Sequence, residues 1–322
     1  MSPDPDAGAT RPTSAGLEPW APEATLAPAA AAVEPEGFVV LADGDVRIHF
    51  VDWGGPAEVT GPGVLLLPGL LQPAASWAPV ARRLCVDCRV VVADLRGQGL
   101  SDGPMHGYEL DTLMTDAVAV AEGSGLLQPG GRIVVAGHGF GAVVAGVTAG
   151  ALGDTCAGLV LVDGGWERAE TTAGVDVEEF LRGLHEPPEV MRSMTAYLED
   201  RRAFDPATWD ADQERAARDA VVETAAGRVV RAVRPHVVEA MVRTMFGYEP
   251  ATVLPAVAAP VLALVALAGA PPERLDELRR VAAARAAAGA GPIRVAGYPS
   301  AGHNLMRYRP ADVTAAILEV SG

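Results

Sequence analysis

The chain has 322 residues, of which 49% are hydrophobic and 20% are charged, and its formal net charge is −16. This length and composition predict a soluble globular protein with a sizeable core. The negative charge argues against a nucleic-acid or an anionic-membrane partner, because both attract cationic surfaces. All 25 basic side chains are Arg, which excludes chemistry that depends on lysine, such as Schiff-base catalysis.

The first segment, residues 1–36, is rich in Pro, Ala and acidic side chains and has no hydrophobic period. Such a segment cannot bury enough apolar surface to order itself, so we expect a disordered tail. It lacks the basic start and the unbroken apolar run of a signal peptide. The odd number of cysteines (Cys85, Cys88 and Cys156) fits a reducing compartment. We therefore expect a cytoplasmic protein.

Short apolar runs begin after the tail. Residues 37–45 and 46–55 read as two strands around an Asp-Gly turn, which predicts a hairpin. The next runs are GVLLLPG, CRVVVADLRG, RIVVAGHG, GLVLVDGG, PVLALVA and IRVAGYPS. Continuous apolar runs are typical of strands covered on both faces, and hence of a parallel sheet. Helical stretches lie between several of them, so the fold class is predicted to be doubly wound α/β.

One long segment interrupts this alternation. Residues 167–253 contain no expected strand; DVEEFLRGL, PPEVMRSMTAYLEDRRAF, WDADQERAARDAVVETAAG and PHVVEAMVRTMFG all read as helices. An insertion at this point would lie above the carboxyl ends of the strands, where α/β sheets bind ligands. We therefore expect a helical cap over residues 167–253 and an α/β core built from residues 37–166 and 254–322.

Four motifs follow one another along the expected core: LLLPGLLQPAASW, ADLRGQGLSDGP, VVAGHGFGAVV and SAGHNLMRYRP. In this order the chain resembles the α/β-hydrolase fold, in its cap-bearing branch. The resemblance implies a mostly parallel sheet with flanking helices. It also implies that His303 is the catalytic histidine and that the backbone N–H groups of Leu70 and Phe140 form an oxyanion hole. Gly139 stands where the family has its serine nucleophile.

The sequence departs from the family pattern at three chemical positions. Gly139 has no side chain, Pro68-Gly69 replaces the usual His-Gly before the oxyanion residue, and no Asp or Glu follows PVLALVA directly. Asp163, one strand earlier, is the candidate partner of His303, although an Asp there could also cap the following segment. Glycine keeps the sharp turn without backbone strain, and backbone amides do not depend on Ser. Proton transfer with oxyanion stabilisation therefore remains open.

The leading hypothesis is a non-hydrolytic enzyme in which His303 moves a proton. The substrate would be a bulky, largely apolar small molecule resembling a polyketide, undergoing C–C bond formation, cyclisation or rearrangement. Family members from secondary metabolism imply such uses, and the Arg, Ala, Gly and Pro bias indicates a GC-rich genome, which fits antibiotic biosynthesis. One alternative is a binding protein that has lost its chemistry. Another is a serine hydrolase in which Gly139 replaces a natural Ser.

The sequence also offers candidates for the pocket wall and bears on cofactors and metals. Trp77, Trp166 and His138 are candidates for lining the pocket, although the tryptophans could belong to the core and His138 to the packing of the turn. The sequence contains no dinucleotide fingerprint and no His/carboxylate cluster, so we expect neither cofactor nor metal. It gives no indication of the oligomeric state.

Overall fold

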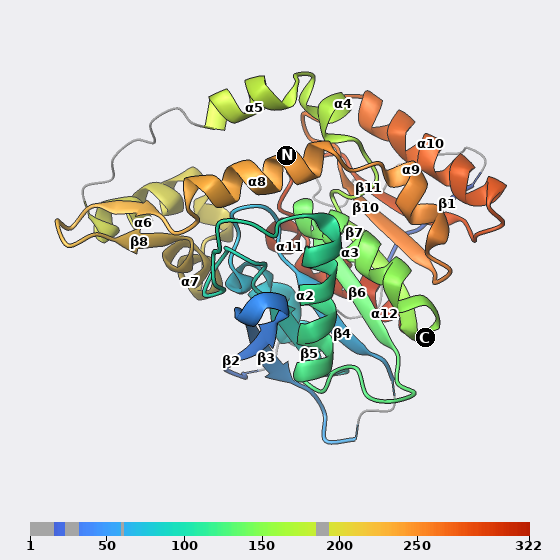
Figure 1. The fold of residues 1–322 in the computed structure, drawn as a ribbon, viewed down its shortest axis with the longest axis horizontal. Coiled ribbons are helices and arrows are strands. Elements are labelled where there is room, and N and C mark those ends of the chain that lie inside the picture. The colour runs from blue at the N-terminus through green and yellow to red at the C-terminus, as the bar shows by residue number, and fades with distance from the viewer. Residues whose placement is uncertain (1–15, 23–31, 59–60, 185–192) are drawn as a thin grey trace, which may run out of the picture.

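The computed structural model describes residues 16–22, 32–58, 61–184 and 193–322. Within these residues one large sheet carries the fold (Figure 1). Its strands run in the order β1 (Leu17–Pro19), β11 (Ile293–Tyr298), β10 (Val261–Ala266), β7 (Cys156–Val162), β6 (Ile133–His138), β4 (Gly63–Leu67), β5 (Val90–Ala93), β3 (Val46–Gly54) and β2 (Glu36–Ala42). Pairing is parallel from β1 to β5 and antiparallel where β3 meets β5 and β2.

The sheet is covered on both faces, as the continuous apolar runs predict. In β4, Leu65 and Leu67 belong to one buried cluster, whereas Val64 and Leu66 belong to a second. The first cluster includes residues of α2 (Leu110–Gly123), α3 (Phe140–Leu152) and α10 (Glu273–Ala287). The second includes residues of α1 (Ala78–Leu84), α11 (Leu305–Tyr308) and α12 (Pro310–Glu319). The expected α/β-hydrolase fold class is confirmed, including the β2–β3 hairpin.

The segment of residues 167–253, which is expected to form a cap and is called the cap segment or cap below, differs from the expected all-helical form. Its helices are α4 (Ala169–Ala173), α5 (Val177–Leu184), α6 (Met194–Phe204), α7 (Ala211–Asp219), α8 (Pro235–Phe246) and α9 (Pro250–Val253). A small antiparallel hairpin, β8 (Val221–Glu223) and β9 (Val229–Arg231), stands between α7 and α8. Gly227, at φ +72°, closes its turn, and a valine of β9 is buried. The expectation of no strand in residues 167–253 is therefore wrong.

The tail also differs in part from its expected disorder. Leu17–Pro19 adds the parallel edge strand β1 beside β11, and the backbone N–H of Trp20 donates to Val295 O at 2.8 Å. Leu17 is buried against the core. A three-residue strand carries no periodic signal, and its backbone is satisfied only by a partner far along the chain. Residues 1–15 and 23–31 of the expected tail lie outside the described residues.

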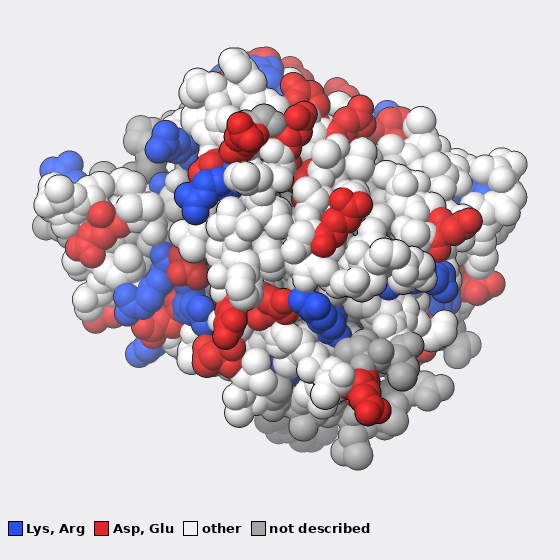
Figure 2. Space-filling view, turned by 60° about the horizontal axis from the view of Figure 1, so that its bottom comes forward, with Lys and Arg blue, Asp and Glu red and all other residues white. Residues whose placement is uncertain are grey.

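On the face shown in Figure 2, acidic side chains are interspersed with arginines instead of forming one continuous patch. None of the helices in the described ranges is long and apolar enough to cross a membrane.

Candidate active site

The turn between β6 and α3 holds Gly139, at the position where the family resemblance leads us to expect a serine nucleophile. Gly139 follows the last residue of β6 and has φ +53° and ψ −116°. This left-handed backbone favours glycine, because a side chain there costs about 1–3 kcal/mol of strain. A Cβ placed on Gly139 would stand 3.2 Å from Nε2 of His303. The imidazole therefore faces the space that a nucleophile would fill.

His303 is held by Asp163, as the sequence predicts. Nδ1 of His303 lies 2.6 Å from Oδ2 of Asp163, which follows the last residue of β7. The other oxygen of Asp163 accepts from the Ala266 amide at 2.8 Å and pairs with the Arg274 guanidinium at 3.0 Å. Burial acts to raise the pKa of Asp163, but the hydrogen bond from His303 and the charge of Arg274 outweigh it and lower that pKa. An ionised Asp163 orients Nδ1–H towards itself and leaves Nε2 as the proton acceptor.

His138 and Gln72 contact the loop that carries His303 and Asn304. Nδ1 of His138 lies 3.0 Å from Oε1 of Gln72, and its Nε2 lies 3.0 Å from the backbone oxygen of His303. Oε1 of Gln72 also accepts from the Gly69 amide at 3.1 Å, and its amide nitrogen donates to Asn304 at 2.9 Å. Burial lowers the pKa of His138 to about 3, which favours a neutral ring with a single N–H, so the ring donates to only one of these two oxygens. Its position indicates support of the loop.

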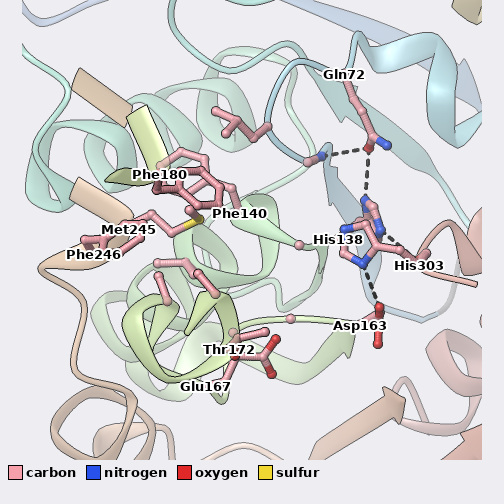
Figure 3. Close-up of a pocket in the computed structure, with 18 residues that line it drawn as sticks. Gln72, His138, Phe140, Asp163, Glu167, Thr172, Phe180, Met245, Phe246 and His303 are labelled. Carbon is pink, nitrogen blue, oxygen red and sulfur yellow. Dashed lines mark hydrogen bonds and ion pairs between the residues drawn. The ribbon is translucent and has the colours of Figure 1, made fainter. Parts of the chain in front are cut away.

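A cavity of about 340 Å³ opens over Gly139 and His303 (Figure 3). Phe180 from α5 and Met245 and Phe246 from α8 bring the cap to this cavity. The rings of Phe180 and Phe246 pack with centroids 5.3 Å apart. The remaining lining comes from the core and from the segment around α4, and it is mostly small or apolar. A mostly apolar cavity with a few polar side chains on its wall is typical of a small-molecule site.

Of the other residues that the sequence predicts for the site, some line the cavity and some do not. Leu70, Phe140 and His138 line the cavity, and Phe140 is the first residue of α3, where backbone N–H groups have no intrahelical partner. Trp77 and Trp166 are fully buried in the two core clusters and do not line this cavity. As pocket candidates these tryptophans are wrong, because their large apolar rings are used to fill the core.

Three polar residues near the cavity have no role predicted from the sequence. Gln72 lies within the motif LLLPGLLQPAASW, and Glu167 lies in the loop that follows β7 and Asp163. Arg274, on α10, contacts both Asp163 and Glu167. Glu167 lies a few residues after the end of β7, in the loop at the carboxyl edge of the sheet, and that position is the signal that could have indicated it. Nothing local in the sequence indicates Arg274, whose contacts span more than 100 residues.

The described side chains include no group of three or more His, Cys, Asp or Glu residues arranged to hold a metal ion. Cys85, Cys88 and Cys156 are buried free thiols.

Comparison with known protein families identifies the family to which the chain belongs. The sequence profile described as "Alpha/beta hydrolase family" matches residues 64–317. The chain belongs to the alpha/beta hydrolase family. The matched range spans the core strands β4 to β11 and the whole cap between them. Relatives of the chain are named as hydrolytic enzymes of small molecules.

Curated relatives match only part of the chain. Epoxide hydrolase 4 of Homo sapiens is 34% identical over 110 residues, which is 34% of this chain and 28% of the human protein. N-formylmaleamate deformylase of Pseudomonas putida is 38% identical over 91 residues, covering 28% of this chain and 32% of that protein. The matched segments thus span about a third or less of these relatives.

Solved structures match almost the whole fold at low identity. E-2-(acetamidomethylene)succinate hydrolase superimposes with a TM-score of 0.70 at 18% identity, over 89% of this chain and 99% of that one. A thioesterase domain from the curacin biosynthetic pathway gives 0.69 at 18% identity, over 88% and 99% of the two chains. At these identities the likeness establishes the shared fold.

Proposed function

We propose that this protein is a non-hydrolytic enzyme that moves protons on an apolar small molecule and forms no covalent intermediate with it. The observation that carries the proposal is the placement of the His303 ring. Its Nδ1 is bound to Asp163 at 2.6 Å, and its Nε2 faces the empty position above Gly139 at 3.2 Å from a nucleophile's Cβ. A base is in place, and the atom that it would activate in a serine hydrolase is missing.

The reaction proposed is abstraction of a proton from a carbon beside a carbonyl group. Nε2 of His303 takes the proton, and the C–H electron pair passes to the carbonyl oxygen as an enolate. The backbone N–H groups of Leu70 and Phe140 stabilise that oxygen; one such donor is typically worth about 2.7–4 kcal/mol in the transition state. Return of the proton from His303 to a different carbon gives a rearranged isomer. In cyclisation the enolate carbon instead attacks a second carbonyl carbon of the substrate; a C–C bond forms, the π electrons of that carbonyl move to its oxygen, and that oxygen takes the proton from His303.

The substrate proposed is a bulky, largely apolar compound of the polyketide kind. The lining from Phe140, Phe180, Met245 and Phe246 supports an apolar ring system beneath the cap. The space above Gly139 supports a substrate that reaches the floor of the cavity, where a serine would otherwise project. The name of one structural neighbour, a thioesterase domain from the curacin biosynthetic pathway, places this fold in natural-product synthesis for that protein.

Two alternative functions make different predictions. A binding protein without chemistry would catalyse no proton exchange at all. A serine hydrolase captured with Gly at position 139 would be inactive as it stands. In that protein Gly139→Ser would restore turnover of generic esters.

The experiment uses tetralone, a bicyclic aryl ketone, in deuterium oxide. Catalysed loss of its α-proton signal is followed by proton NMR, and p-nitrophenyl ester hydrolysis is measured in parallel. We expect exchange well above the buffer rate and no ester turnover by the unaltered protein. Absence of exchange, combined with strong ester turnover by Gly139→Ser, would replace the proposal with the serine hydrolase.

A further inference from the structure

A second polar region of the cavity has no task in the proton transfer described above. Glu167, just before α4, and Thr172, within α4, both line the cavity. Figure 3 shows them away from Gln72, in a different part of the cavity wall. Among the described residues, Oε2 of Glu167 and Oγ1 of Thr172 are buried side-chain atoms with no hydrogen-bond partner.

Unpaired oxygens of this kind are costly. A buried polar group without a partner costs about 1–3 kcal/mol, and a charged group costs more. Most buried polar side-chain atoms are therefore paired, and an exception calls for an explanation. Of the eight such atoms in the described residues, these two belong to residues that line this cavity, and they lie within six residues of each other in the sequence. A bound ligand is the simplest partner for both.

One carboxylate oxygen of Glu167 accepts hydrogen bonds from Arg274, and the other has no partner. Nε and a terminal nitrogen of Arg274 donate to Oε1 of Glu167 at 3.2 and 2.8 Å. The same guanidinium pairs with Asp163 at 3.0 Å. Arg274 therefore fixes the position of Glu167 relative to Asp163. Oε2 of Glu167 is buried and has no hydrogen-bond partner. A substrate that contacts Oε2 would be oriented with respect to the base.

We propose that Glu167 and Thr172 form a subsite that binds a hydroxyl group of the substrate. A hydroxyl group donates one hydrogen bond, which Oε2 of Glu167 accepts, and it accepts one, which the Thr172 hydroxyl donates. Above the pKa of Glu167, which burial raises to about 7, the carboxylate is ionised, and a carbonyl or ether oxygen, which only accepts, leaves it unpaired. The binding comparison is therefore made above that pH. The inference rests on the proposed function only in treating this cavity as the substrate site, and it specifies a hydroxylated substrate.

The test measures binding separately from turnover. Hydroxytetralones substituted at each aromatic position are compared with the matching methoxytetralones by isothermal titration calorimetry. For at least one position, we expect the hydroxy compound to bind the unaltered protein about tenfold more tightly than its methoxy partner, the effect of one hydrogen bond to a charged group. In Glu167→Gln and Thr172→Val this preference falls to about twofold or less.

Matched controls come from the same segment. Thr171 contacts Glu277 and does not line the cavity, and Glu170 is exposed. Thr171→Val and Glu170→Gln should keep the full preference, and circular dichroism verifies that all four variants are folded. Equal binding of hydroxy and methoxy compounds to the unaltered protein, a preference retained in Glu167→Gln, or no binding of either series would overturn the subsite. A retained preference without proton exchange would overturn only the proposed function.

Discussion

At the residue scale, Glu167 should leave a signature in the pH dependence of stability. Burial raises its pKa from 4.5 to about 7, against the opposing charge of Arg274; Asp163 pushes the pKa further up and His303 pulls it down. The folded protein therefore binds this proton more tightly than the unfolded chain, and stability falls as the pH rises from 4.5 to about 7. Glu167→Gln removes this loss, which we expect to be roughly 1–3 kcal/mol.

The measurement is urea unfolding of both proteins at the two ends of this pH range. The free energy of unfolding of Glu167→Gln, relative to the unaltered protein, should increase between the lower and the higher pH. The other titrating groups remain in both proteins, so the comparison isolates Glu167. If the difference in the free energy of unfolding between the two proteins stays constant across this pH range, the pKa of Glu167 is the same in the folded and the unfolded protein.

Sequence motifs predict the individual residues that belong to the inherited machinery. His303 and Gly139 lie where the motifs place them, and Asp163, a candidate because it ends a strand, bonds to His303. Motifs do not predict Glu167 and Arg274, because these residues reach the site through a buried ion pair between segments far apart in the sequence. The tryptophans are misjudged for a related reason: a large aromatic ring suits a pocket wall and a core equally, and only packing decides between them.

At the scale of elements, the edge strand β1 offers a direct test of packing. Leu17 is 7% exposed, whereas its neighbour Glu18 points outward. We expect Leu17→Ala to lower the free energy of unfolding by about 2 kcal/mol, at the low end for a buried leucine because the site lies at the sheet edge. Glu18→Ala should change it by no more than about 0.5 kcal/mol. Equal effects of the two substitutions in urea unfolding would indicate that β1 does not pack on β11.

The elements that the sequence predicts well are the ones with long apolar patterns. The core strands and helix α8 carry enough buried positions for their period to be visible. The short strands β1, β8 and β9 have three residues each, too few to display a period. Their formation depends on backbone pairing with a partner strand, which no local pattern records. The Ala-rich stretch before β8 further favours a helical interpretation.

At the scale of the whole molecule, the alternation of strands and helices predicts the sheet, and the gap in that alternation predicts the cap. The candidate site then follows from topology, because β6 and β7 are parallel neighbours and their carboxyl ends meet at one edge. His303 and Asp163 are 140 residues apart and still meet at 2.6 Å. What topology does not supply is the chemistry, since related folds serve many reactions.

The central claim is that His303, with no nucleophile beneath it, transfers a proton of the substrate. Its most direct test is the rate of α-proton exchange of tetralone in His303→Gln relative to the unaltered protein. His106→Gln, which alters an exposed histidine away from the cavity, is the matched control. We predict a loss of at least about 100-fold for His303→Gln, the usual contribution of a general base, and no loss for His106→Gln. An exchange rate in His303→Gln equal to that of the unaltered protein would contradict the claim.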